Sequence, residues 1–343
     1  MSPFEIQLDL TPSIRNPQSG IGRTARFTFD ALKRVAGEEM ITAVARTGDL
    51  PRPRRVGRSI LHSFEHKLPL TLGLTRVLTV HDLWTLKPNP FQPPEYQRSQ
   101  GPRLKRAIHC ADLIVTPSET VKQALLARFP EKKGRVHAVP HGYQLSPQTT
   151  APPTPAVAHF LSDARPFILC IACLEVRKNL TPLLTALEHL PVRLALIGNL
   201  GFGGQEIEAR LKAHPRRTHI LHLTSAQDAD LAALFQACTT YVQPSLDEGF
   251  GMPVIDALRF GKRPVLSEIP VFFEIAGGTA DYFTPTDASQ LTEVLKHNLA
   301  HTQDPKPSRT RAQSLTWDRV AHQLLSLYRP KRWPAALRET VPA

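Results

Sequence analysis

The sequence predicts an α/β protein with two doubly wound, Rossmann-like domains that face a central cleft. Short apolar runs rich in β-branched residues alternate with segments of helical spacing along most of the chain. The length of 343 residues is sufficient for two domains of ordinary size. A stretch rich in Pro and Thr, within residues 144–166, shows neither the apolar runs of a strand nor the spacing of a helix. These three observations favour two parallel sheets joined by a linker.

The first half of the chain alternates between strand-like and helix-like segments. Helical spacing of apolar residues predicts helices at residues 22–36 and 118–129. Apolar, β-branched runs predict strands at FEIQLDL (4–10), MITAVA (40–45), RVLTVHD (76–82), DLIVTPS (112–118) and RVHAVP (135–140). We assign this half, residues 1–150, to an N-terminal Rossmann-like domain.

The second half repeats the alternation. Strands are expected at FILCIACLE (167–175), RLALIGN (193–199), HILHLTS (219–225), TTYVQPS (239–245) and RPVLSE (263–268). Helices are expected at residues 180–190, 205–214, 228–238 and 253–261. We therefore expect a linker over residues 151–165, a C-terminal Rossmann-like domain over 166–315, a last amphipathic helix over 316–330 and a tail over 331–343.

Basic residues exceed acidic ones, with a formal net charge of +12. Most of the excess lies in the first half, notably in RPRRVGR (52–58) and RLKR (103–106). Such runs indicate either solvated faces or an anionic partner: a phospholipid headgroup, a lipid phosphate or nucleic acid. Few aromatic residues separate the charges, which argues against nucleic acid. The side chains concerned are Arg52, Arg54, Arg55, Arg103, Lys105 and Arg106.

Composition also bounds the compartment. No apolar run approaches the roughly 20 residues that span a bilayer, and the first residues, MSPFEIQLDL, lack the apolar core of a secretory leader. The four cysteines are few for a disulfide framework. Cys170 and Cys173 form a C-x-x-C inside an apolar run that predicts a buried strand. We expect a cytoplasmic protein that can associate peripherally with the inner face of the membrane.

The stretch PSLDEGFGMPVIDALRFG (244–261) carries the clearest chemical signal. Pro253 and Gly261 frame a short helix after a glycine turn, and backbone N–H groups at such a helix start can hold a diphosphate. Asp256 lies about one turn into the helix and leans back toward its start. Because phosphates would repel this carboxylate, it suits ribose hydroxyls, and Glu248 suits hydroxyls on the other side of the diphosphate. The pattern predicts a nucleotide joined through diphosphate to a sugar.

Other polar residues follow the expected strands. His81 ends one strand of the first half, and Arg177 and Lys178 follow a strand of the second. Ligands bind beyond the carboxyl ends of strands in open α/β sheets, so we expect these side chains at one cleft. The two cations can neutralise a diphosphate without a metal or another cofactor. Helix N-capping accounts for Asp228 and Asp230, the lone Asp-x-Asp.

These segments resemble family 4 of the retaining glycosyltransferases, which have the two-domain GT-B fold. The likeness rests on residues 244–268, with LEVRKNL (174–180) upstream, and on TVHDL (79–83) and SGIGR (19–23) in the first half. It runs from about residue 5 to about residue 330. The chain is similar in particular to bacterial mannosyltransferase-like enzymes of surface polysaccharide synthesis.

The resemblance implies roles for the matching residues. Glu248 would contact donor-sugar hydroxyls, and Lys178, with Arg177 as its companion, would bind phosphate. His81 would lie near the transferred sugar, and Asp256, one methylene shorter than the family's usual Glu, would bind the ribose. The other implied donor-binding positions are Gly20 and Gly22 in a loop over the diphosphate, Gly198 and Leu223 near the base, and Gly249, Phe250 and Gly251 at the sugar and phosphate. The helix over 316–330 would cross back to the first domain.

The implied reaction moves a hexose from a nucleoside-diphosphate sugar to a hydroxyl of a glycan or lipid-linked acceptor. It would retain the anomeric configuration through a front-face mechanism. The expected donor is GDP-mannose, with UDP-linked hexoses second. The first domain would receive the acceptor, and its basic charge suits an anionic acceptor at the membrane surface.

Other functions share parts of this pattern. Gly20, Gly22 and Ala25 spell the G-x-G-x-x-A of a dinucleotide fingerprint, and Arg46 could read the 2′-phosphate of NADP in an oxidoreductase. However, the glycines come about nine residues after the expected strand end, whereas the fingerprint needs a tight turn directly after a strand. A nucleotide-sugar epimerase or phosphorylase would keep the fold and change the chemistry. These remain the alternatives.

Overall fold

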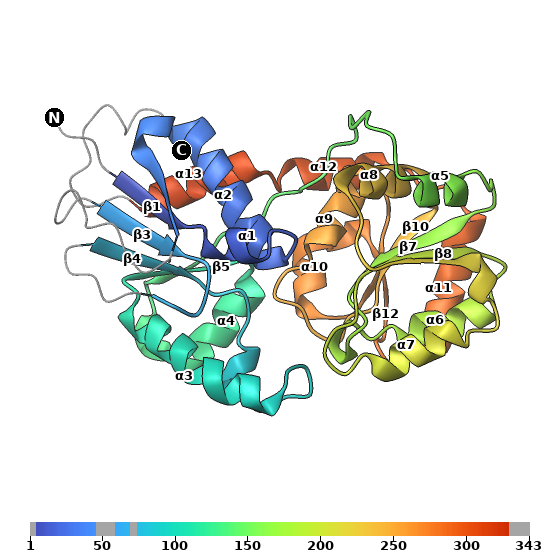
Figure 1. Cartoon of the computed structure of the whole chain (residues 1–343), viewed down its shortest axis with the longest axis horizontal. Coiled ribbons are helices and arrows are strands. Elements are labelled where there is room, and N and C mark those ends of the chain that lie inside the picture. Colours follow the sequence, from blue (N-terminus) through green and yellow to red (C-terminus); the bar gives the residue numbers. More distant parts are fainter. Residues whose placement is uncertain (1–4, 46–58, 69–73, 329–343) are drawn as a thin grey trace. The chain divides into compact units, whose positions relative to one another are not determined.

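The computed structural model describes residues 5–45, 59–68 and 74–328 (Figure 1). The chain divides into two compact units. Unit 1 takes in residues 1–88, 94–142 and 315–343, and unit 2 takes in residues 89–93 and 143–314. Each unit contains one six-stranded sheet of parallel strands. The predicted fold class of two doubly wound α/β sheets is therefore confirmed.

The sheet of unit 1 has the strand order β2-β1-β3-β4-β5-β6. Leu8 lies opposite His62, and His62 lies opposite Val77, so the central strands end close together. Polar residues that follow these strands therefore meet at one edge of the sheet. The strands are β1 (Glu5–Asp9), β2 (Ile41–Val44), β3 (Ser59–Ser63), β4 (Leu74–Thr79), β5 (Leu113–Thr116) and β6 (Val136–Ala138).

Helices cover both faces of this sheet (Figure 1). Helices α2 (Gly20–Ala36) and α13 (Trp317–Leu327) pack together on one face, where Leu8 and Leu324 belong to one buried cluster. Helices α3 (Pro94–Cys110) and α4 (Glu119–Arg128) lie on the other face, over a second buried cluster. The short α1 (Thr11–Arg15) and the 3₁₀ helix η2 (Trp84–Leu86) follow β1 and β4.

Unit 2 has the strand order β12-β11-β10-β7-β8-β9. Its core includes a buried cluster that contains Leu194, Val242 and Phe283. The strands are β7 (Phe167–Ile171), β8 (Arg193–Ile197), β9 (Ile220–Leu223), β10 (Thr240–Gln243), β11 (Val265–Ser267) and β12 (Asp281–Phe283). The helices are α5 (Pro155–Leu161), α6 (Thr181–Glu188), α7 (Gln205–Lys212), α8 (Asp228–Ala237), α9 (Met252–Arg259), α10 (Pro270–Ala276), α11 (Ala288–Ala300) and α12 (Lys306–Gln313).

Two departures from the sequence prediction concern helices α3 and α5. Helix α3 was not predicted, because its sequence is mostly polar and contains Pro102. Helix α5 lies within the segment 151–165, which was predicted to be a linker, and unit 2 already begins at Tyr143. The predicted last helix agrees with the structure: α13 lies within the segment 316–330, belongs to unit 1 and packs against α2.

A buried histidine ties the last helix to the sheet of unit 1. The His62 side chain is fully buried, with Nδ1 2.5 Å from the Tyr328 hydroxyl and Nε2 2.7 Å from Thr79 Oγ1. Burial, with a smaller effect from nearby His81, lowers the pKa of His62 to about 3. The imidazole is therefore neutral in the folded protein at neutral pH.

We expect unit 1 to lose stability as the pH falls below about 6.5. In the unfolded chain His62 binds a proton near that pH, whereas in the folded protein its pKa is lowered to about 3, so protonation favours the unfolded state. The slope for one such group is about 1.4 kcal/mol per pH unit. Trp84 and Trp317, the tryptophans among the residues that the structure describes, belong to unit 1, so urea unfolding followed by tryptophan fluorescence at pH 7, 6 and 5 reports on it. His62→Asn should reduce the slope by about that amount, and an unchanged slope would contradict this account.

Candidate functional site

The strand order of unit 2 reverses between β7 and β10, which pair side by side. Ligands bind at such switch points in doubly wound sheets, beyond the carboxyl ends of the strands. After β7 the chain forms the 3₁₀ helix η4 (Val176–Lys178), and after β10 it forms the loop that carries Glu248. The sequence predicted Arg177, Lys178 and Glu248 at one ligand site, and the structure brings them into contact.

Glu248 accepts from both cations. Its Oε2 lies 2.8 Å from Arg177 Nη1, and its Oε1 lies 2.5 Å from Lys178 Nζ. Arg177 also reaches Glu175, with Nη2 2.5 Å from Oε1. Ser245 donates its hydroxyl to Glu248 Oε1 at 2.8 Å. Two acids and two bases thus form a compact cluster, hereafter the acid–base cluster, whose formal charges balance.

The cations control the ionisation of Glu248. Burial by itself would raise the pKa of this carboxyl group, because only 8% of the residue is exposed. Lys178 and then Arg177 outweigh that effect and lower the pKa to about 2. Glu248 is therefore a carboxylate at neutral pH, held by partners that could equally hold a phosphate.

An asparagine in a left-handed conformation locks the two segments together. Asn179 has a φ of 52°, and its side-chain amide donates to the carbonyl oxygens of Pro244 at 3.0 Å and Pro285 at 2.7 Å. Leu246 N–H in turn donates to the Arg177 carbonyl at 2.8 Å. The loop after β10 is thus fixed against η4, which positions the acid–base cluster before any ligand arrives.

A glycine-rich loop, residues 198–204, packs against the segment after β7. A Cβ on Gly198 would fall 2.0 Å from the Ala172 carbonyl oxygen, and one on Gly204 would fall 1.7 Å from that of Leu174. The loop leaves Leu200 44% and Phe202 41% exposed. Sequence reasoning missed these two residues, although apolar side chains inside a glycine-rich loop are a signal that could have found them.

Gly198 and Leu223, both predicted near the base, are neighbours. Gly198 N–H donates to the Leu223 carbonyl at 2.8 Å, and His222 Nε2 lies 2.9 Å from the Gly198 carbonyl oxygen. The expected base-binding backbone is therefore one continuous edge beyond β8 and β9.

The predicted glycine turn precedes α9 directly. Gly251 has a φ of 108°, a conformation that favours glycine, and stands at the N-cap of the helix. Phe250 is buried, so of the stretch Gly249 to Gly251 it is the backbone that suits ligand contact. The helix begins at Met252 with Pro253 in its first turn, as predicted.

Asp256 has a contact that the sequence did not reveal. Its Oδ1 accepts from the backbone N–H groups of Gln144 at 2.7 Å and Leu145 at 3.0 Å, and the residue is only 4% exposed. Both residues lie at the start of the long segment of unit 2, residues 143–314. The predicted ribose contact would have to come in addition to this structural one.

His81 lies in unit 1, just beyond β4. Burial, with a smaller effect from His66, lowers its pKa to about 4, and the ring hydrogen-bonds to the backbone of Phe64. Nε2 is buried without a hydrogen-bond partner among the residues that the structure describes. His141 lies beside it, with ring centroids 5.8 Å apart, and stacks on Trp317. A neutral imidazole with an unmatched nitrogen can hydrogen-bond to a ligand hydroxyl.

Gly20 and Gly22 lie in the first turn of α2, not in a loop. Ser19 caps the helix by accepting from Gly22 N–H at 3.0 Å. A Cβ on Gly22 would fall 2.3 Å from the Asn16 carbonyl oxygen, so close packing explains this glycine. Because α1 stands between β1 and α2, the glycines are not on a tight turn after a strand, which removes the basis of the dinucleotide fingerprint.

The basic side chains predicted at an anionic partner are only partly described. Arg103, Lys105 and Arg106 are exposed on α3. The other three, Arg52, Arg54 and Arg55, lie outside the described residues. Across the described ranges, no group of His, Cys, Asp and Glu is arranged to hold a metal ion. Nor does that part of the chain contain a helix long and apolar enough to cross a membrane.

Two glycosyltransferase family models match different parts of the chain. Residues 157–313 match the family model for glycosyl transferases group 1, and residues 54–146 match that for glycosyltransferase family 4. The resemblance to glycosyltransferase family 4 that the sequence predicted is therefore confirmed. Its relatives include O-antigen chain mannosyltransferase B of Escherichia coli, 24% identical over 74% of this chain and 70% of that protein.

Two further comparisons bear on extent and fold. The serotype-specific mannosyltransferase WbdA of Escherichia coli is 26% identical over 74% of this chain, which spans only 33% of that relative. Sucrose-phosphate synthase from Thermosynechococcus elongatus superimposes with a TM-score of 0.74 at 19% identity, over 95% of this chain and 98% of that one. The GT-B fold predicted from the sequence is confirmed, and these matches do not favour the oxidoreductase, epimerase or phosphorylase alternatives.

Removing the Asp256 carboxylate should destabilise unit 2. Asp256→Ala leaves two backbone N–H groups without their acceptor, and we expect a loss of about 2–3 kcal/mol in the free energy of unfolding. Asp256→Asn keeps an acceptor oxygen and should cost about 1 kcal/mol or less. Urea unfolding followed by circular dichroism measures both. Equal losses would show that the charge of Asp256, and not its hydrogen bonds to Gln144 and Leu145, stabilises the unit.

Proposed function

We propose that this glycosyltransferase moves a mannosyl residue from GDP-mannose to a hydroxyl of a glycan or lipid-linked acceptor, with retention of configuration. The acid–base cluster at the β7–β10 switch point supports this proposal most directly. It joins two cations, suited to a diphosphate, to a carboxylate suited to sugar hydroxyls. No cofactor takes part in the proposed reaction besides the nucleotide-sugar substrate.

In the proposed mechanism Arg177 and Lys178 bind and stabilise the leaving group, the nucleoside diphosphate. A bound diphosphate competes with Glu248 for Arg177 and Lys178, since both anions suit the same donors. The cations then stabilise the negative charge that develops on the departing phosphate oxygen as the glycosidic bond breaks. Because the charge is neutralised by side chains already in place, no metal ion is required in this mechanism.

Glu248 and His81 would orient the sugar. Once the diphosphate takes up the cations, the carboxylate oxygens of Glu248 can accept from sugar hydroxyls. The resemblance to family 4 implies a place near the transferred sugar for His81, whose ring nitrogen Nε2 can hydrogen-bond to a hydroxyl. A front-face mechanism needs no covalent nucleophile, because the departing phosphate oxygen can take the proton of the acceptor hydroxyl. The acceptor thus attacks from the side that the diphosphate leaves, which retains the configuration.

Donor and acceptor are inferred from relatives and from charge. Both relatives described above are mannosyltransferases by name, and one of these two is an O-antigen chain enzyme. This favours mannose as the transferred sugar, with GDP as its carrier. The basic excess in the first half of the sequence favours an anionic acceptor, such as a lipid-linked glycan at a membrane surface.

Titration calorimetry with GDP-mannose, UDP-glucose and NADP tests the proposal. We expect GDP-mannose to bind most tightly, and Lys178→Ala to weaken it by at least about tenfold, because a charge-assisted contact to phosphate is lost. Arg103→Ala, an exposed residue of unit 1, is the matched control and should leave the affinity unchanged. Binding of NADP alone, or equal binding to the parent and Lys178→Ala, would contradict the proposed donor site.

A further inference from the structure

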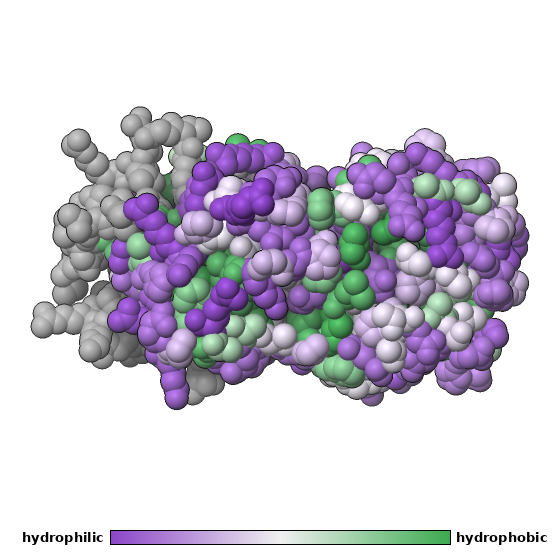
Figure 2. All heavy atoms as spheres, turned by 90° about the horizontal axis from the view of Figure 1, so that it is seen from below, coloured by the Kyte–Doolittle hydropathy of each residue, from purple (hydrophilic) through white to green (hydrophobic). Residues whose placement is uncertain are grey.

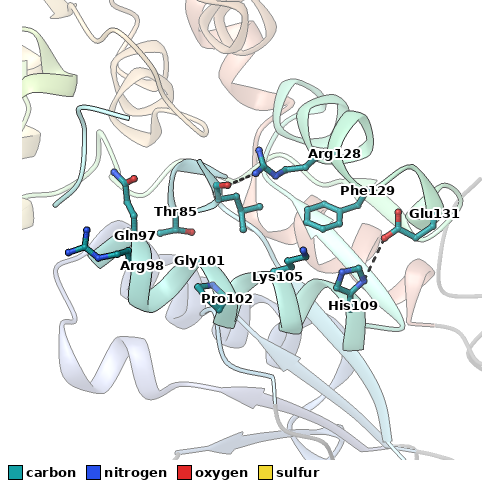
Figure 3. Close-up of a pocket in the computed structure, with 11 residues that line it drawn as sticks. Thr85, Gln97, Arg98, Gly101, Pro102, Lys105, His109, Arg128, Phe129 and Glu131 are labelled. Atoms are coloured by element: carbon teal, nitrogen blue, oxygen red, sulfur yellow. Dashed lines mark hydrogen bonds and ion pairs between the residues drawn. The ribbon is translucent and has the colours of Figure 1, made fainter. Parts of the chain in front are cut away.

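A groove of about 920 Å³ opens in unit 1, between α3, η2 and the end of α4 (Figure 3). Its size suits a sugar or a short saccharide. Gly101 allows α3 to approach η2 closely, since a Cβ there would fall 2.5 Å from the Thr85 carbonyl oxygen. Thr85 and Gln97, which also line the groove, provide groups that can hydrogen-bond to hydroxyls.

The charge of the groove is unbalanced. Arg98, Lys105 and Arg128 line it, with Glu131 as the one acid among its lining residues. Glu131 pairs with His109, at 3.6 Å between Oε1 and Nδ1. Arg98 and Lys105 have no acidic partner among the residues that the structure describes. A concave wall lined by uncompensated charge of one sign attracts ligands of the opposite sign.

The cations stand on separate elements that fix their places. Figure 3 shows Arg128, from α4, on one side of the groove and Lys105, from α3, on the other. Arg128 donates to the carbonyl of Leu86, which holds the guanidinium over the groove. Arg98 and Lys105 follow one another along one face of α3, about 10 Å apart along the helix axis. That spacing exceeds one phosphate group and fits a phosphate with an attached sugar.

The rest of this surface does not share the arrangement. Arg103 and Arg106 are exposed on α3, but neither lines the groove. The face of unit 1 that carries α3 is mixed, with hydrophilic side chains around apolar ones (Figure 2). Of the basic run RLKR, only Lys105 lines the groove. The neighbouring Arg103 and Arg106 therefore provide matched controls.

We propose that this groove binds a phosphorylated saccharide, with the phosphate between Lys105 and Arg128 and the sugar along α3 toward Arg98. Its role as part of the acceptor rests on the proposed glycosyltransferase function. The groove starts at Thr85, four residues after His81 along the chain. A phosphorylated acceptor held there would supply the anion that the basic first half of the sequence indicates.

Mannose 6-phosphate is the probe, with mannose as its uncharged counterpart. Calorimetry should show binding of mannose 6-phosphate and not of mannose. Lys105→Ala should weaken it by at least about tenfold, and Arg106→Ala by less than about twofold. Arg128→Ala should act like Lys105→Ala, and thermal unfolding checks that it still folds. No binding to the parent protein, or equal losses in Lys105→Ala and Arg106→Ala, would overturn the proposal.

Two further experiments distinguish a lipid headgroup from a sugar phosphate as the ligand, and the groove from the donor site. Vesicles of equal parts phosphatidylglycerol and phosphatidylcholine test a lipid headgroup. If Lys105→Ala weakens vesicle binding and Arg106→Ala does not, the groove also binds headgroup phosphate. Vesicle binding without mannose 6-phosphate binding would overturn the groove proposal and show that general surface charge binds the membrane. GDP is titrated into the same variants. Absence of GDP binding by the parent protein would defeat the donor proposal. Normal GDP binding, together with mannose 6-phosphate binding that Lys105→Ala leaves unchanged, would defeat the groove proposal alone.

Discussion

One buried carboxylate organises the candidate donor site. Glu248 faces Arg177 and Lys178 at hydrogen-bonding distance and stays ionised because their charges outweigh its burial. Without it, Glu175 alone would face the two cations, and one positive charge would have no counter-charge. With it, the cluster is neutral and folded before the donor arrives. The same balance makes Glu248 a competitor of any phosphate that approaches the cations.

The surrounding structure holds these charged side chains in position. The switch in strand order places the ends of β7 and β10 side by side. Asn179 then joins the two loops through carbonyl groups on both sides. Glycines of the loop 198–204 let it lie against the segment after β7, where no Cβ would fit. Packing and hydrogen bonds thus fix the charges in place, so that little reorganisation remains for ligand binding.

The local sequence pattern predicted the fold class and most of the candidate site. It did not predict contacts between residues that are far apart in the sequence. Alternating strands and helices gave the fold class, and strand ends gave Arg177, Lys178 and Glu248, because parallel strands end at a common edge. Helix α3 was missed, since Pro102 and a polar sequence weaken the helical signal. The bond from Asp256 to Gln144 joins residues more than a hundred positions apart, and no local pattern encodes it. The groove on α3 arises only when η2 and α4 pack beside that helix.

The central claim is that Glu248 occupies the place of the donor's diphosphate on the two cations. The affinity of the Glu248→Gln variant for inorganic diphosphate, a ligand without sugar or base, tests this directly. If the carboxylate competes with phosphate, removing its charge should tighten binding by about tenfold, since a repulsive neighbour is gone. Weaker binding by this variant than by the parent protein would show instead that Glu248 assembles the phosphate site, and would contradict the account.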